Sequence, residues 1–145
     1  MNMIMKADKK VFGFDCVCLI KGVLWGWNGN SEANYGGAGY CVNGVPDVGA
    51  DTMMNRYCKH VSKDFSNIKV GEAVWISGHI GVYIGDGKVV ECTPKWDNKV
   101  QITNLGNVGN KNGNYRMWTS HGELPWIEYD SDTVPYKPTP ADAGA

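Results

Sequence analysis

Cys16 and His79 are the residues of this chain best suited to covalent chemistry. Cys16 follows Asp15 at the start of a run whose apolar positions recur with helical spacing, which predicts a thiol at a helix N-terminus. The helix dipole and backbone N–H groups there favour the thiolate, the nucleophilic form of cysteine. His79 has small neighbours, Gly78 and Gly81, which leave room for a substrate beside the imidazole. The pair predicts a cysteine nucleophile with a histidine base.

A third polar group is expected to orient the imidazole, and Glu91 is the candidate. Glu91 lies in the second half of a predicted hairpin whose first half begins at His79. A two-residue loop, 86–87, would put the two side chains on opposite faces of the sheet, whereas a three-residue loop, 85–87, puts them on one face. Gly87 can adopt the left-handed conformation that the longer loop requires, so we expect the three-residue loop.

Cys18 is the competing nucleophile. It lies about 200° around the helix from Cys16, at about 100° per residue, so only one of the two thiols can face a cleft. The position of Asp15 as a helix cap favours Cys16. The five cysteines have no disulfide-framework spacing and no zinc motif. Four of them are expected to be inert packing residues: Cys18, Cys41, Cys58 and Cys92. We expect His60 at the surface and His121 in a loop with a structural role.

The elements that must position these residues are two helices followed by a sheet. The first helix is predicted over 16–27 and ends at the Asn-Gly-Asn of residues 28–30; a long loop follows. A second helix is predicted over 51–60, capped by Asp51. The expected strands are 73–76, the hairpin arms 79–84 and 88–92, then 100–103 and 115–118. Helices first and an antiparallel sheet second predict an α+β fold.

Composition narrows the class of protein. The chain has 145 residues, 43% of them apolar and 20% charged, with a net charge of −1. These values predict one globular domain with no broad basic surface for nucleic acid and no membrane insertion. We assign residues 1–129 to the domain and the Pro-rich residues 130–145 to a linker or tail. The first ten residues lack the apolar core of a signal peptide.

Several segments resemble motifs of the NlpC/P60 peptidoglycan hydrolases. The run FDCVCLI at 14–20 is similar to that family's Asp-Cys-Ser-Gly-Leu segment, and GHIGVYIG at 78–85 is similar to its histidine strand. Glu91 falls where the family places its third polar residue. The stretches 91–96 and 118–126 resemble the catalytic domains of phage endolysins in that group. Together the resemblance covers most of residues 11–129.

The resemblance implies a papain-like α+β fold, in which Cys16 begins a helix packed against a sheet that carries His79 and Glu91. It also implies a substrate contact at Asp15. The small residues Gly78 and Gly81 are expected to border the substrate beside the imidazole, and no cofactor is expected. The absence of a zinc motif predicts no metal. The chain departs from the family in three ways. Val-Cys replaces Ser-Gly after the nucleophile, Glu91 replaces the usual His, Asn or Gln, and no tyrosine precedes Cys16. Either the segment before Cys16 is shortened, or Trp25 or Tyr35 lines that side of the cleft.

The function expected from these observations is an endolysin-type hydrolase. It would cut a stem-peptide or cross-bridge amide of bacterial peptidoglycan through a Cys-His acyl-enzyme. Two alternatives remain: an N-acetylmuramoyl-L-alanine amidase or acyltransferase with the same dyad, and a wall-binding module with a degenerate site. We expect synthesis in the cytoplasm and release to the wall, through a holin if a phage encodes the protein. A separate wall-binding module could follow the linker.

Overall fold

The framework of the protein is a single curled β-sheet. The computed structural model describes residues 16–29, 37–97, 99–108, 111 and 113–129. Within these residues seven strands form one sheet in the order β1-β7-β2-β3-β4-β5-β6. The strands are β1 (Lys59–Ser62), β2 (Ala73–Ile76), β3 (His79–Gly85), β4 (Lys88–Thr93), β5 (Lys99–Leu105), β6 (Tyr115–Arg116) and β7 (Ser120–Glu123). Neighbouring strands are antiparallel except β5 and β6, which are parallel.

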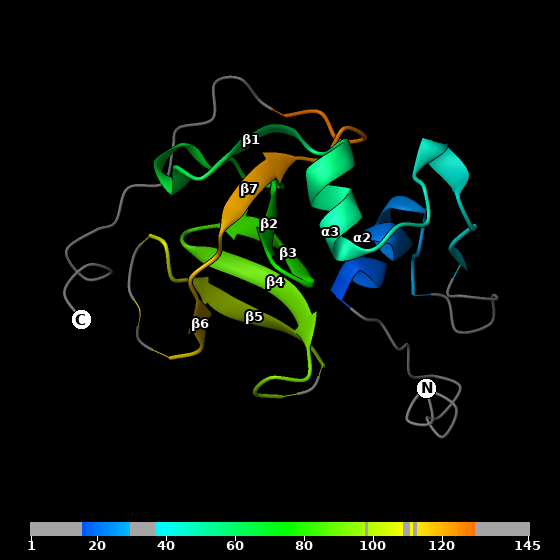
Figure 1. Cartoon of the computed structure of the whole chain (residues 1–145). Helices are drawn as coiled ribbons and strands as arrows, with labels where there is room; N and C mark the ends of the chain where they lie inside the picture. The colour runs from blue at the N-terminus through cyan, green and yellow to red at the C-terminus, as the bar shows by residue number, and fades with distance from the viewer. Residues whose placement is uncertain (1–15, 30–36, 98, 109–110, 112, 130–145) are drawn as a thin grey trace.

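The helical part of the described chain is small. Helix α2 (Cys16–Leu24) is followed by α3 (Ala50–Thr52), which continues as the π-helical turn η3 (Met53–Tyr57). Single 3₁₀ turns lie at η2 (Val42–Gly44) and η4 (Phe65–Asn67). Both helices lie at one side of the curled sheet, where α2 contacts β3 and β4 (Figure 1). This packing brings the start of α2 close to the start of β3.

Helix α2 ends earlier than the sequence predicts, and the reason is a glycine cap. Gly26 has a φ of 94°, a left-handed conformation that glycine adopts without steric cost. The N–H of Trp27 donates to the Gly22 carbonyl at 2.9 Å, and the N–H of Gly26 donates to the Val23 carbonyl at 3.1 Å. These two bonds are a Schellman motif, which terminates a helix. The predicted end at residues 28–30 is therefore wrong.

The predicted α+β class, and with it the papain-like arrangement of helices on a central antiparallel sheet, is wrong. The described chain is mostly β, with a seven-stranded sheet curled into a half-barrel and two short helices. The second helical segment stops at Tyr57, and Cys58 is already extended. Two strands, β1 and β7, form where a helix end and a loop were expected. The parallel β5–β6 pair also breaks the antiparallel pattern.

Alternation along the central strands divides the core between the two faces of the sheet. On β2, Ala73 packs with the helices, whereas Val74 packs on the opposite side. The helix-side cluster consists of Val17, Ile20, Ala50, Met53, Met54, Ala73, Ile80 and Leu124. The opposite cluster consists of Phe65, Ile68, Val74, Tyr83, Val89, Leu105 and Trp118. Both faces of β2 and β3 are thus covered, which fixes the register of the strands that position the site.

The predicted hairpin is confirmed, but its turn is not the predicted one. Asp86 and Gly87, with φ values of 53° and 70°, form a two-residue turn of the kind favoured in hairpins. An irregularity between Tyr83 and Gly85 adds one residue to β3, which is the effect of a β-bulge. The bulge shifts the register by one position. Glu91 therefore shares the His79 face, as predicted, although the three-residue loop is absent.

Candidate active site

Cys16 and His79 meet where the start of α2 approaches the start of β3. The two side chains form a hydrogen bond, which acts on the pKa of His79. The sulfur also lies 4.0 Å from the Gly78 carbonyl oxygen. Cys16 is half-buried against the helix-side core, so its sulfur is held in place without being sealed from solvent. The predicted proximity of the two residues is confirmed.

His79 contacts Glu91 through its other side. His79 Nε2 lies 2.7 Å from Glu91 Oε1, which leaves Nδ1 as the ring nitrogen for Cys16. Burial by itself would lower the pKa of His79, but the hydrogen bonds to Cys16 and Glu91 outweigh it, and the pKa lies above its ordinary value. The imidazole is therefore oriented at both nitrogens and readily accepts a proton.

Glu91 is completely buried and is held as a carboxylate by several donors. Thr103 Oγ1 donates to Oε2 at 2.5 Å, and Arg116 Nε donates to Oε1 at 2.7 Å. Burial would raise the pKa of Glu91, but the hydrogen bonds from His79, Thr103 and Arg116, together with the Arg116 charge, hold the pKa below its ordinary value. A buried charge is tolerated only when it is paired and hydrogen-bonded in this way.

Trp118 forms one wall beside the imidazole. Its ring stacks on His79 with centroids 5.4 Å apart and planes inclined by 18°. Arg116 lies over the same indole at 5.9 Å from the ring centroid. Trp118 is buried, so the stack fixes the plane of the imidazole and keeps water from that face.

Asp51 fixes the turn that precedes His79. Its Oδ1 accepts hydrogen bonds at 2.8 Å from both Trp75 Nε1 and the backbone N–H of Gly78. These donors, the Gly78 N–H first, lower the pKa of Asp51. The sequence predicted Asp51 as a helix cap, but the cap position belongs to Gly49. Asp51 instead connects α3 to the β2–β3 turn that carries the imidazole.

The residues predicted to contact substrate lie in different places. Gly78 is beside Cys16, at the site. Gly81 is buried, and a Cβ there would lie 2.9 Å from Val89 Cγ1, so packing of the hairpin explains its missing side chain. Trp25 turns to the 40–47 loop, where its Nε1 donates to the Val45 carbonyl at 2.8 Å and its ring packs on Tyr40. Asp15 and Tyr35, and the linker 130–145, lie outside the described residues.

The other two histidines lie on β1 and β7. His121 is buried on β7, not in a loop, and contacts Glu72 Oε1 at 2.7 Å through Nδ1 and the Asp64 carbonyl at 2.8 Å through Nε2. His60, as predicted, is exposed; it pairs with Glu123 at 2.9 Å. Both contacts join β1 and β7 to the rest of the sheet. They indicate structural roles.

The cysteine predictions have mixed outcomes. Cys58 is half-buried, and desolvation first, then the nearby Glu72 charge, raises its pKa to about 12, so it is inert as a nucleophile. Cys92 is buried on β4, as expected of a packing residue. Cys41 is exposed with a φ of 57°, which contradicts its predicted packing role. Cys18 is half-buried on α2.

Three residues of the site were not predicted: Thr103, Arg116 and Trp118. Thr103 is two positions from Gln101, the residue that pairs with Glu91 across β4 and β5, so correct pairing of these strands would have found it. Arg116 and Trp118 lie in the predicted strand 115–118, but no local pattern in the sequence indicates which strand it joins or that these two side chains reach the site.

In the part of the chain with described structure, no group of three or more His, Cys, Asp or Glu side chains could hold a metal ion. No helix among these residues has the length and apolar character needed to cross a membrane. Comparison of the chain with protein-family models, curated proteins and solved structures finds no match. Support for a function therefore comes from the geometry of the site and the motifs of the sequence.

Proposed function

We propose that the protein is a cysteine-dependent hydrolase that cuts an amide bond of bacterial peptidoglycan. One observation carries the proposal: the continuous hydrogen-bonded chain from Cys16 through His79 to Glu91. A nucleophile, a base and an orienting group in this order are what acyl transfer by a thiol requires. Burial of Glu91 with three donors supports the orienting role, because its carboxylate has no freedom to turn away.

In the proposed reaction, the Cys16 thiol passes its proton to His79 Nδ1, and the thiolate attacks the carbonyl carbon of the amide. The tetrahedral intermediate collapses to a thioester on Cys16, while the leaving amine takes the proton from the imidazolium. Water, deprotonated by His79, then hydrolyses the thioester and restores the thiol. Backbone N–H groups at the start of a helix can donate to an oxyanion, and the Cys16 N–H is the proposed donor.

The substrate class rests on the sequence motifs. The segments 14–20 and 78–85 resemble the nucleophile and histidine segments of NlpC/P60 peptidoglycan hydrolases. The papain-like fold implied by that resemblance is not found, so the fold lends no support to the substrate. The motifs and the contacts between Cys16 and His79 are independent observations, and they agree on a cysteine nucleophile.

The test is the clearing of purified cell walls by the wild type and by Cys16→Ala, with mass spectrometry of the soluble products. We expect clearing by the wild type, background clearing by Cys16→Ala, and new peptide termini in the products. A freed lactyl group of muramic acid would identify an amidase instead of an endopeptidase. Equal clearing by the two proteins would refute the nucleophile, and binding without turnover at any pH would refute the hydrolase.

A further inference from the structure

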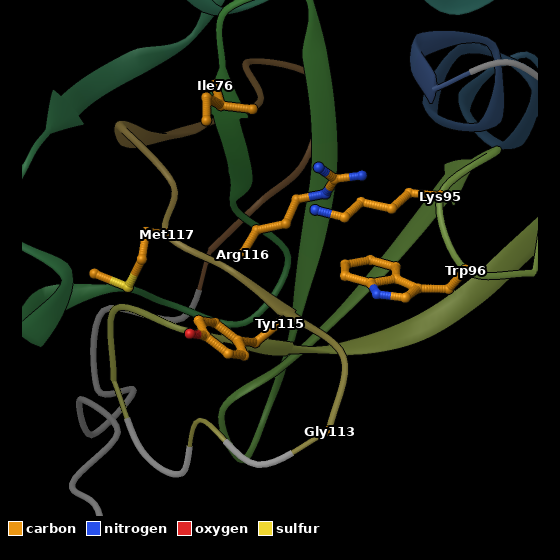
Figure 2. A pocket seen from close by; sticks show the side chains of 7 residues that line it. All are labelled: Ile76, Lys95, Trp96, Gly113, Tyr115, Arg116 and Met117. Atoms are coloured by element: carbon orange, nitrogen blue, oxygen red, sulfur yellow. The ribbon is translucent and has the colours of Figure 1, made fainter.

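A pocket of about 440 Å³ opens beside the proposed active site. It lies between the bend that follows β4 and strand β6, with Lys95 and Trp96 on one side and Tyr115 and Arg116 on the other. Figure 2 shows the Lys95 and Arg116 side chains extending toward each other beside the Trp96 ring. The reacting side chains, Cys16, His79 and Glu91, do not line this pocket.

Two cations share one aromatic ring in the pocket. Lys95 Nζ lies 5.0 Å, and Arg116 Cζ 5.1 Å, from the centroid of the Trp96 ring. An indole ring attracts each cation, but like charges held together repel each other. Among the described residues, the carboxylate in contact with this pair is Glu91, on Arg116. Because Glu91 is fully buried and also contacts His79 and Thr103, it cannot turn toward Lys95.

Arg116 has N–H groups that can still donate hydrogen bonds to a ligand. Its Nε is used by Glu91, and one terminal nitrogen donates to Thr93 Oγ1 at 2.9 Å. A guanidinium has a second terminal nitrogen with two further N–H groups. The ammonium of Lys95 adds three donors, and no carboxylate in the described chain pairs with it. The pocket thus offers positive charge and N–H donors from two directions.

The pocket adjoins the reacting groups. Ile76 lines it and pairs directly with His79 across β2 and β3. Arg116 contacts Glu91, which contacts His79. A group held in the pocket would therefore belong to a residue close to the scissile amide of a bound peptide.

We propose that this pocket is a subsite for a free carboxylate of the peptide substrate, held between Lys95 and Arg116 with the apolar part of its residue against Trp96. The inference rests on the proposed function and deepens it, because it predicts preference for a stem peptide with a free carboxylate over its amidated counterpart. Charge-assisted hydrogen bonds supply such discrimination, since the amide presents no negative charge to the two cations.

The test uses two synthetic stem peptides that differ at one group only: one peptide has a free carboxylate, and the other has the corresponding carboxamide. We expect the wild type to prefer the acid by about 10- to 100-fold in kcat/KM. Lys95→Met should remove most of that preference by raising KM for the acid. Lys99→Met is the matched control: it removes one charge from an exposed position on β5 and should keep the preference.

Calorimetry separates this inference from the proposed function. The acid peptide should bind Cys16→Ala more tightly than the amide does, and the Cys16→Ala/Lys95→Met double variant should bind both equally. This binding difference would support the subsite even if the wild type proved inactive. Equal binding of acid and amide to Cys16→Ala would overturn it. Competition by glycerol phosphate without any acid–amide difference would also overturn it, because the pocket would then select a phosphate.

Discussion

Arg116 Nε donates at 2.7 Å to Glu91 Oε1, the same carboxylate oxygen that His79 Nε2 contacts. Arg116 and His79 therefore share one acceptor. The Arg116 charge helps to keep Glu91 ionised, yet the same charge opposes the rise in the pKa of His79. Arg116 thus has two effects: it keeps Glu91 charged, so that Glu91 can orient the imidazole, and it helps the imidazole to release its proton to a leaving amine.

Alkylation of thiols should separate Cys16 from Cys18. In the wild type at pH 6, iodoacetamide should modify Cys16 at least about 10-fold faster than Cys18, because the His79 imidazolium stabilises the Cys16 thiolate. The rates are measured by mass spectrometry of digested protein after timed quenching. His79→Ala should slow Cys16 and leave Cys18 unchanged, so Cys18 serves as an internal control. Equal rates for both thiols would contradict the pairing.

Replacement of Glu91 by glutamine should lower the pKa of His79. The hydrogen bond and the charge of Glu91 both raise that pKa, and the substitution removes the charge while keeping the shape. The pKa is measured by NMR titration of the imidazole. His60, which is exposed, gives a reference signal in the same spectra. An unchanged His79 titration would mean that Glu91 does not control the imidazole.

The raised pKa of His79 and the lowered pKa of Glu91 determine how the stability of the fold depends on pH. Because His79 has a higher pKa in the folded state than its ordinary value of 6.5, its contribution to stability is complete below that value and is lost as the pH rises through the folded-state pKa. For Glu91, whose folded-state pKa is lowered, the contribution is lost as the pH falls through that pKa. Denaturant unfolding of wild type and Glu91→Gln across pH measures both.

Substitution of Asp51 should test whether a residue outside the proposed reaction positions the imidazole. Asp51→Ala removes the acceptor for Trp75 and Gly78 and should lower kcat by about 10- to 100-fold, the scale expected from a small displacement of a catalytic group. Asp51→Asn keeps an oxygen that can accept both bonds and should recover most of the activity. Equal loss in both variants would indicate that the charge, and not the hydrogen bonds, is what matters.

The buried His121–Glu72 pair should contribute stability that weakens as the pH rises. Burial would lower the pKa of His121, but the hydrogen bonds to Glu72 and the Asp64 carbonyl raise it above its ordinary value. His121→Gln should therefore cost about 1–3 kcal/mol near pH 6 and less as the pH rises through the folded-state pKa. Chemical denaturation at several pH values measures this. His60→Gln, at an exposed pair, should change stability little.

Local signals in the sequence predicted the hairpin and the residues it carries. Alternating apolar residues on both sides of Asp86-Gly87 are typical of two paired strands, and His79 and Glu91 lie on those strands. The thiol at the start of a helix also follows from a local pattern. These three residues could be identified because each depends on at most one turn or one helix end.

The overall class of the fold could not be predicted from the same signals. Strands β1 and β7 have the sequences KHVS and SHGE, which lack the alternation of a half-buried strand. They pair with each other although they lie far apart in the sequence. Arg116 depends on the parallel pairing of β6 with β5 after a polar loop. Such contacts are set by tertiary packing, which overrides local propensity.

The position of β7 has a consequence for how the protein is made. This strand lies between β1 and β2, yet it is the last of the seven described strands in the chain. During synthesis on a ribosome, the sheet therefore stays open until residues beyond Glu123 have emerged. Arg116 and Trp118 emerge only shortly before. A nascent chain already carries Cys16 and His79 but lacks these partners, so competence for the proposed reaction arises only when translation of the sheet is complete.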